Sequence, residues 1–216
     1  MTLQVFNAFS LKVIMTILMV VDHIGQFFPN TPEYFRWIGR LVAPVFFFLA
    51  TESYIHTSNK VKYIKRLYVS SLIMFVGSII LWIFFRDDSF IPNNIFFTLA
   101  VNLSLIYIRE EKGNNSNNII MYIALILLAF IAEGSFIATI LFMLFHYLKH
   151  EKKNMSIVFI IVSLLFFPSI QWMQVFSLPF ILMYNGKRGP NIKKFFYIFY
   201  PAHIWILFLL SQFITT

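Results

Sequence analysis

The sequence has no cysteine and few charged residues. The absence of cysteine excludes disulfides, thiolate nucleophiles and cysteine-ligated metals. Only 12% of the residues are charged, against about 25% in an average soluble domain. Only 9 of the 216 residues are acidic, against 17 lysines and arginines. The chain therefore has too little polar surface to cover a soluble globule.

Apolar residues dominate instead, at 59% of the chain with 28 phenylalanines and a mean hydropathy of +0.77. A membrane-spanning helix needs roughly 20 mostly apolar residues, so this length allows about eight or nine spans with short loops. We predict an all-α, polytopic transmembrane helical bundle that forms a single domain over residues 1–216. The first apolar run lacks a small-residue cleavage site, so we expect it to be retained as a span.

Polar residues divide the chain into nine apolar segments. Segments five to eight are short for a full crossing, which leaves eight spans as an alternative to nine. The segments cover residues 9–28, 36–56, 65–85, 93–108, 118–132, 135–148, 155–168, 170–184 and 195–213.

The basic residues predict the orientation of the chain. Loops after even-numbered segments, together with Lys12, carry most of them, whereas only Arg36, Arg40 and Arg86 fall on the opposite side. Because cytoplasmic loops are enriched in lysine and arginine, we expect a cytoplasmic N-terminus and an outside C-terminus. The net charge of +8 then reflects topology, not nucleic-acid binding. The cytoplasmic set is Lys60, Lys62, Lys65, Arg66, Arg109, Lys112, Lys149, Lys152, Lys153, Lys187, Arg188, Lys193 and Lys194.

Asp22 and His23 lie in the outer part of the first segment. Ionisable groups inside a span are costly and are functional candidates by default. Histidine suits proton transfer near neutral pH, and the neighbouring carboxylate could alter its basicity. The structural alternative is a hydrogen bond to another helix.

Lys12 lies eleven residues before His23, about 16 Å away and near the same helical face. A cation near the cytoplasmic surface and a base deeper in the membrane suit a long anionic donor that enters from the cytoplasm. The alternative is a lysine that extends to the interface and fixes the end of the helix.

Arg36 and Arg40 stand one helical turn apart on the side that has few basic residues. We expect them either to hold an anion or to form a structural ion pair with Asp22 or Glu33.

Three further polar positions are candidates for site support. Glu52 and His56 are four residues apart and share a helical face, and His203 lies within the last segment. His203 is either a second functional imidazole or a hydrogen-bonded core residue. No spacing supports a metal site, even with His146 or His150 added, so we expect none.

Several blocks of the sequence resemble the TraX family, named for an F-pilin N-acetylase of conjugation systems. The resemblance covers segments one to four and the last segment, and the stretch from about 113 to 190 is only generically hydrophobic. The blocks are Leu11-Lys12, Asp22-His23-Ile24-Gly25, Ile38 to Phe46, Glu52, His56-Thr57, Tyr63, Arg66-Leu67, Asn94 to Leu99, and Tyr200-Pro201-Ala202-His203.

TraX proteins are similar to a wider group of transmembrane acyltransferases that use cytoplasmic acetyl-CoA. That group shares a basic residue, ten intervening residues and a histidine in the first helix, which Lys12 and His23 match, with lysine in place of the more frequent arginine. The resemblance implies that His23 is the catalytic imidazole, that Lys12 serves the donor side and that Arg40 supports the site.

The sequence therefore predicts acetyl transfer from acetyl-CoA to an amine or hydroxyl at a bacterial plasma membrane. The acceptor would be a peptide or pilin N-terminus, or a glycan. Asp22 would tune His23, and Arg36 or Arg40 would stabilise the oxyanion. Lys60, Lys62, Lys65 and Arg66 would attract the phosphates of CoA.

Two other classes remain open. A non-enzymatic partner in pilus or peptide assembly, or an immunity protein, would bind a peptide in the bundle without needing His23. A small transporter or channel is the third alternative, but no inverted repeat or pair of broken helices supports it.

Overall fold

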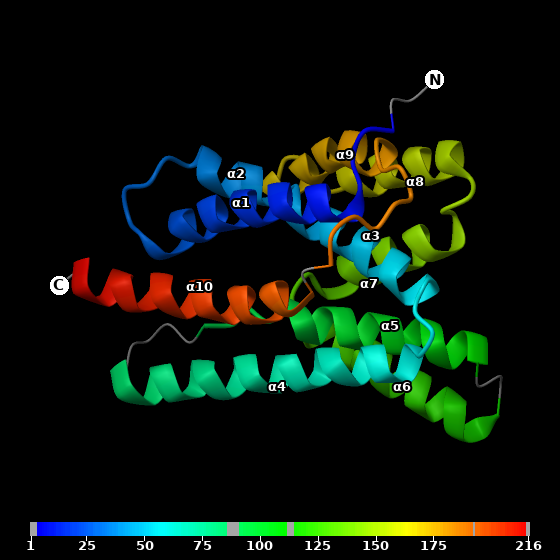
Figure 1. Cartoon of the computed structure of the whole chain (residues 1–216), viewed down its shortest axis with the longest axis horizontal. Coiled ribbons are helices and arrows are strands. Elements are labelled where there is room, and N and C mark those ends of the chain that lie inside the picture. The colour runs from blue at the N-terminus through cyan, green and yellow to red at the C-terminus, as the bar shows by residue number, and fades with distance from the viewer. Residues whose placement is uncertain (1–3, 86–90, 112–114, 192, 215–216) are drawn as a thin grey trace. The chain divides into compact units, whose positions relative to one another are not determined.

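The computed structural model describes residues 4–85, 91–111, 115–191 and 193–214 (Figure 1). Over these ranges every regular element is helical, which confirms the predicted all-α class. Arg86, Lys112 and the side chain of Lys193, used above for orientation, lie outside the described residues.

Each of the nine predicted segments is helical. Seven of the segments each correspond to one uninterrupted helix. Each of these helices contains most of its apolar run, and several extend into the flanking polar residues. These seven helices are α1 (Ala8–Phe27), α4 (Lys60–Phe85), α5 (Ile95–Glu111), α6 (Ser116–Ile131), α7 (Ser135–Tyr147), α8 (Lys152–Leu164) and α10 (Lys193–Ile214).

The other two segments are divided. The second forms α2 (Tyr34–Gly39) and α3 (Val42–Ile55), and Pro44 lies in the first turn of α3. Proline has no N–H to donate to the preceding turn, so it favours the start of a helix, although α10 accommodates Pro201 in its interior. The eighth segment forms a 3₁₀ helix, η1 (Ile170–Ser177), followed by α9 (Leu178–Leu182) with Pro179 in its first turn.

Four helical stretches within the described ranges are long and apolar enough to cross a membrane: Ala8–Phe27, Tyr34–Ile55, Lys60–Phe85 and Lys194–Ile214. Shorter apolar helices cover Ser116–Ile131, Ser135–Tyr147 and Ile170–Leu182. The protein is thus a helical membrane protein with four clear candidate spans. The total of eight or nine crossings and the direction of insertion remain predictions.

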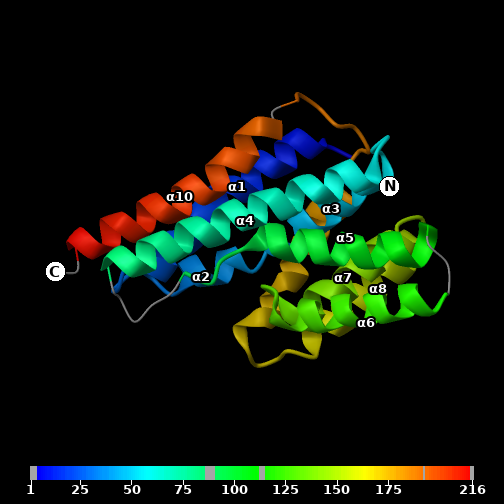
Figure 2. The same ribbon diagram turned by 90° about the horizontal axis from the view of Figure 1, so that it is seen from below.

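The chain divides into two compact units. The first comprises Met1–Leu49 and Leu148–Thr216, and the second comprises Ala50–Tyr147. In the second unit α4 packs on α5, and α5 packs on α6 and α7 (Figure 2). The largely buried helix α5 is the centre of that unit, and its core includes Val101, Leu105, Ile108, Leu125 and Ala129.

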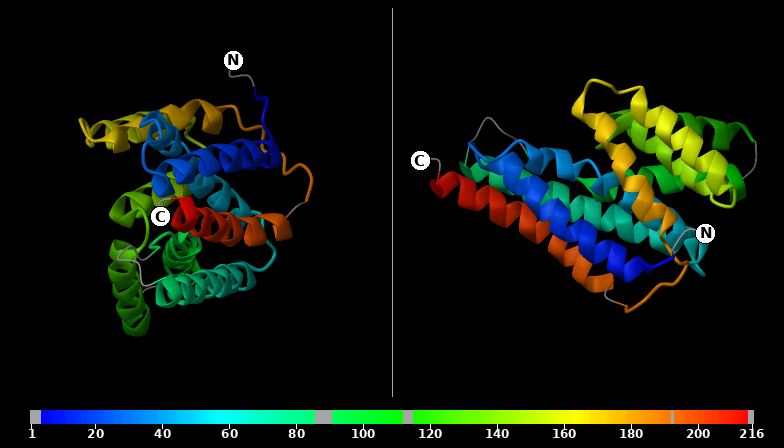
Figure 3. Two further views of the ribbon diagram at one scale, coloured as in Figure 1. Left: turned by 90° about the vertical axis from the view of Figure 1, so that its left-hand side faces the viewer. Right: turned by 90° about the horizontal axis from the view of Figure 1, so that it is seen from above.

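In the first unit α1 lies between α2 and α10 (Figure 3, right). The chain runs in the same direction in α1 and α10 (Figures 1 and 2). A parallel pair is what the predicted orientation requires, because both helices would then run from the cytoplasm outwards.

The start of α1 is fixed by the loop that precedes α10. The N–H groups of Ala8 and Phe9 donate to the carbonyls of Lys187 and Arg188, at 2.9 and 3.2 Å. Asn7 caps the helix by accepting from the N–H of Ser10 at 2.8 Å. These bonds satisfy donors that a helix start leaves unpaired. They also place the basic 187–188 loop at the Lys12 end of α1.

Two glycines allow α1 and α2 to approach closely. A Cβ on Gly39 would overlap the carboxyl group of Asp22, and a Cβ on Gly25 would lie 2.9 Å from Cβ of Phe35. The site described below therefore depends on glycine at position 39.

Gly39→Ala is expected to lower the free energy of unfolding by about 1–3 kcal/mol, the usual cost of overpacking. Gly25→Ala is expected to have a smaller effect, because its Cβ would lie 2.9 Å from Cβ of Phe35 and 3.2 Å from Cδ of Arg36, whereas a Cβ on Gly39 would overlap the carboxyl group of Asp22. Thermal midpoints of the two variants in one detergent test this order. A Gly39→Ala protein as stable as wild type would contradict the close approach.

Candidate functional site

The site is built around two consecutive residues of α1. Successive residues of an α-helix point about 100° apart, so Asp22 and His23 cannot face the same neighbour. Because α1 lies between two helices, each side chain meets a different one. His23 faces α10, and Asp22 faces α2.

His23 and His203 form a buried imidazole pair. Nδ1 of His23 lies 2.8 Å from Nε2 of His203, and the two residues are only 5% and 7% exposed. Phe199 stacks on the ring of His203 with centroids 5.0 Å apart. Tyr200 meets the ring of His23 edge-on at 6.5 Å. His203, the candidate imidazole of the last segment, is therefore in direct contact with His23.

The hydrogen bonds assign the tautomers of both rings. Nδ1 of His203 lies 2.9 Å from the carbonyl oxygen of Phe199, which can only accept, so this nitrogen carries hydrogen. In a neutral ring Nε2 of His203 is then an acceptor, and Nδ1 of His23 must donate to it. The lone pair of His23 is left on Nε2, which makes no hydrogen bond to any described residue.

Asp22 is the centre of an ionic cluster with two arginines. Its Oδ1 lies 2.8 Å from Nη1 of Arg36 and 3.4 Å from Nη2 of Arg40. Arg36 also donates to the backbone carbonyl of Asp22 at 3.0 Å. Arg40 donates to Oε1 of Gln171 in η1 at 3.0 Å and to the carbonyl of Arg36 at 3.2 Å. One carboxylate thus faces two cations, which leaves the cluster with an excess positive charge.

Arg36 and Arg40 were expected either to hold an anion or to form an ion pair with Asp22 or Glu33. In the structure both arginines pair with Asp22. The carboxylate is 13% exposed, and the arginine side chains are 32% and 21% exposed. The arginines are thus held in place but reachable. Since a guanidinium has five N–H donors and Arg40 uses three, Arg40 keeps donors for a further anionic group.

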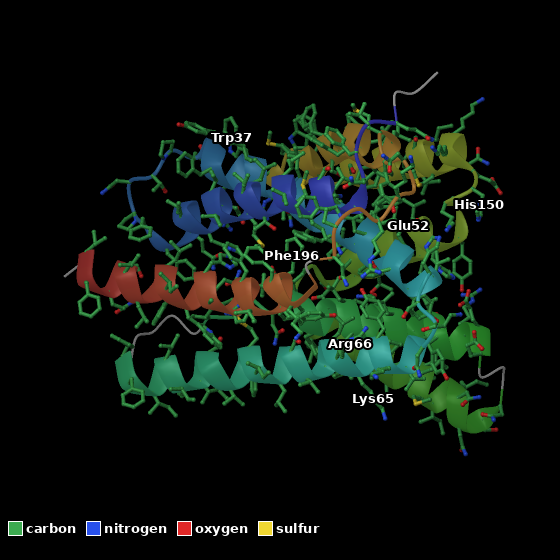
Figure 4. The ribbon with its side chains drawn as sticks, in the orientation of Figure 1. Trp37, Glu52, Lys65, Arg66, His150 and Phe196 are labelled. Atoms are coloured by element: carbon green, nitrogen blue, oxygen red, sulfur yellow. The ribbon has the colours of Figure 1, made fainter. Side chains whose placement is uncertain are left out.

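Lys12 faces the same neighbour as His23. Its Nζ lies 5.7 Å from the centre of the Phe196 ring on α10 (Figure 4), within the range of a cation–π interaction. His23 contacts His203 on that same helix. Lys12 and His23 therefore do share a face, as the eleven-residue spacing predicts.

The other predicted donor-side residues belong to the second unit. Lys60 pairs with Glu111 at 2.8 Å and Glu110 at 3.6 Å, so its charge is largely neutralised. Lys62, Lys65 and Arg66 are exposed on α4, and Figure 4 shows the last two. The structure therefore leaves three of the four available to an anion and gives Lys60 a structural partner.

Glu52 and His56 interact at the end of α3. Nδ1 of His56 lies 2.8 Å from the carbonyl of Glu52 and 4.0 Å from its carboxylate. His56 is mostly exposed, which fits a local helix cap. His146, considered above as a possible metal ligand, hydrogen-bonds Glu110. Within the ranges that the structure describes, no group of three or more potential ligands could hold a metal.

Sequence reasoning missed two members of the site. Gln171, the partner of Arg40, has no sequence feature that distinguishes it from a loop glutamine. The carbonyl of Phe199 lies four residues before His203 on α10, so the helical spacing of these two residues was a usable signal.

The fold and the site define the class: a helical membrane protein with four candidate spans and a buried histidine pair beside a carboxylate–arginine cluster. The sequence model described as "TraX protein" matches residues 8–211, and the chain belongs to the TraX family. The resemblance seen in the sequence is confirmed.

One curated relative is the probable fimbrial assembly protein FimC, serogroup H1, of Dichelobacter nodosus. It is 28% identical to this chain over 235 residues, and the match covers 94% of each protein. No solved structure matches.

Proposed function

We propose that the protein transfers an acetyl group from cytoplasmic acetyl-CoA to an amine or hydroxyl acceptor at the membrane. The observation that carries this proposal is the unshared lone pair on Nε2 of His23, held in a buried site by the Nδ1 hydrogen bond. A base with a fixed lone pair and no competing partner suits proton abstraction.

In the proposed reaction, Nε2 of His23 removes a proton from the acceptor nitrogen or oxygen as that atom attacks the thioester carbonyl. The tetrahedral intermediate then collapses, the carbon–sulfur bond breaks, and the CoA thiolate takes the proton from Nε2. The remaining N–H donors of Arg40 are suited to stabilise the transient oxyanion.

Lys12 would hold the donor at the other end of α1. At about 1.5 Å per residue the eleven-residue separation gives about 16 Å between the cation and the imidazole. That length suits CoA, in which an extended arm separates the phosphates from the sulfur. Lys62, Lys65 and Arg66, which are exposed in the second unit, are the other cations suited to attract an anionic donor.

Acetyl-CoA binding to the purified protein tests the donor side. Lys12→Ala is expected to raise the dissociation constant by about 10- to 100-fold, because a hydrogen bond to a charged group contributes about 1.5–3 kcal/mol. Lys12→Arg keeps the charge and should bind within a few-fold of wild type. Lys153→Ala removes an exposed lysine at the start of α8 and is the matched control.

Saturable binding that weakens only in Lys12→Ala supports the proposal. No binding at millimolar acetyl-CoA by folded protein refutes it.

The relative's name, fimbrial assembly protein, favours a second candidate. In that case the chain would be a non-enzymatic assembly partner that binds a pilin-like peptide. Such a protein should tolerate loss of the His23 imidazole, whereas an acetyltransferase should not. The relative's name also makes a pilin-like peptide N-terminus the first acceptor to test.

A further inference from the structure

The contact between His23 and His203 joins residues 180 positions apart. It continues to a third group, because Nδ1 of His203 donates to the carbonyl of Phe199. All three groups lie in the first unit, on α1 and α10. They form a chain in which hydrogen is donated from His23 to His203 and from His203 to the backbone.

The direction of hydrogen donation is fixed by the last acceptor, the carbonyl oxygen of Phe199. A carbonyl oxygen cannot donate, so a neutral His203 presents only a lone pair to His23. An isolated neutral histidine side chain prefers to carry hydrogen on Nε2, which would leave Nε2 of His23 unable to act as a base. The tautomer needed for proton abstraction is therefore the one that an isolated ring disfavours, and a specific acceptor must impose it.

We propose that His203 is a positioning residue that imposes the Nδ1–H tautomer on His23 and stabilises its charged form. The catalytic meaning of this role rests on the proposed acetyl transfer, whereas the tautomer itself does not. When Nε2 of His23 takes a proton, the Nδ1–H bond to His203 strengthens because its donor becomes cationic. A buried imidazolium is costly without such a partner.

The surroundings of the pair are suited to this role. Stacking of Phe199 and edge contacts from Tyr200 restrict rotation of the His203 ring. Both histidines are buried, so water does not readily replace the acceptor. A ring that could turn would exchange its donor and acceptor atoms and lose the directed chain.

The test combines two variants of the full-length protein with a direct measurement of the tautomer. His203→Gln keeps an acceptor oxygen within reach of His23, and His203→Leu has no acceptor. His150→Gln, at an exposed turn before α8 (Figure 4), is the control. Nitrogen NMR of protein labelled at histidine reports which nitrogen of His23 carries hydrogen, and His23→Asn assigns its signals.

In wild type and His203→Gln the hydrogen should reside on Nδ1, whereas in His203→Leu it should shift to Nε2. Turnover should fall by about 10²- to 10⁴-fold in His203→Leu with an unchanged KM for acetyl-CoA. His203→Gln should retain turnover within about tenfold of wild type, since most of a general-base contribution survives with the tautomer.

Hydrogen on Nε2 of His23 in wild type, or a tautomer that His203→Leu does not change, overturns the inference. A tautomer that responds as expected in a protein that transfers no acetyl group leaves the positioning intact and refutes the proposed function. The two failures are thus distinguishable.

Discussion

Replacing His23 by alanine is expected to lower the rate of acetyl transfer by about 10²- to 10⁴-fold, the usual contribution of a general base. The reason is that Nε2 of His23 carries the one positioned lone pair of the histidine pair, since His203 uses its own toward His23. Release of the CoA thiol measures the rate. Binding of acetyl-CoA should not change, because Lys12 is about 16 Å away along α1.

His23→Asn distinguishes the loss of the Nε2 base from the loss of the hydrogen bond to His203. The asparagine amide can still donate to His203 in place of Nδ1, but it has no counterpart of Nε2. This variant should therefore lose as much activity as His23→Ala while it unfolds nearer to the wild-type temperature. Full activity in either variant would remove the imidazole from the mechanism and favour the assembly partner.

Asp22→Ala is expected to lower the free energy of unfolding by about 2–3 kcal/mol. Removing one partner of a fully buried ion pair costs about 3–5 kcal/mol, because the other charge is left uncompensated. The cost here should be smaller, since the two arginine side chains keep exposures of 32% and 21%. Chemical or thermal unfolding of the purified protein in detergent measures this loss.

A double-mutant cycle tests whether the loss comes from the ion pair. Asp22→Ala combined with Arg36→Leu should be more stable than the sum of the single effects predicts, because no unpaired cation remains at that position. The exposed Arg188 is the matched control, and its substitution should be additive with Asp22→Ala. Additivity of the Asp22 and Arg36 variants would show that their 2.8 Å contact does not stabilise the fold.

The agreement between predicted segments and helices has a simple cause. A chain in lipid must satisfy its backbone hydrogen bonds internally, so a long apolar run becomes a helix whatever packs against it. The divisions before α3 and at α9 depend on proline, and proline was visible in the sequence. What the apolar runs did not reveal is how many of the helices cross the membrane fully.

For the candidate site too, the sequence predicted the local features but not the contacts between helices. That Lys12 and His23 share a face follows from helical periodicity alone, and the contacts of both residues with α10 agree with it. The partners of these residues could not be predicted. Arg36 had two candidate carboxylates, Asp22 and Glu33, and the close approach of α1 and α2 at Gly25 and Gly39 brings it to Asp22.

The sequence by itself thus determined the helical class, the membrane setting, the family and the spacing of the cation and the imidazole, because these depend on composition and on local repeats. Only the tertiary structure decided that His203 accepts from His23 and that Lys60 is neutralised by Glu110 and Glu111. Those pairs join residues far apart in the chain. Their geometry depends on which helix faces pack together, and many packings satisfy the same hydrophobic pattern.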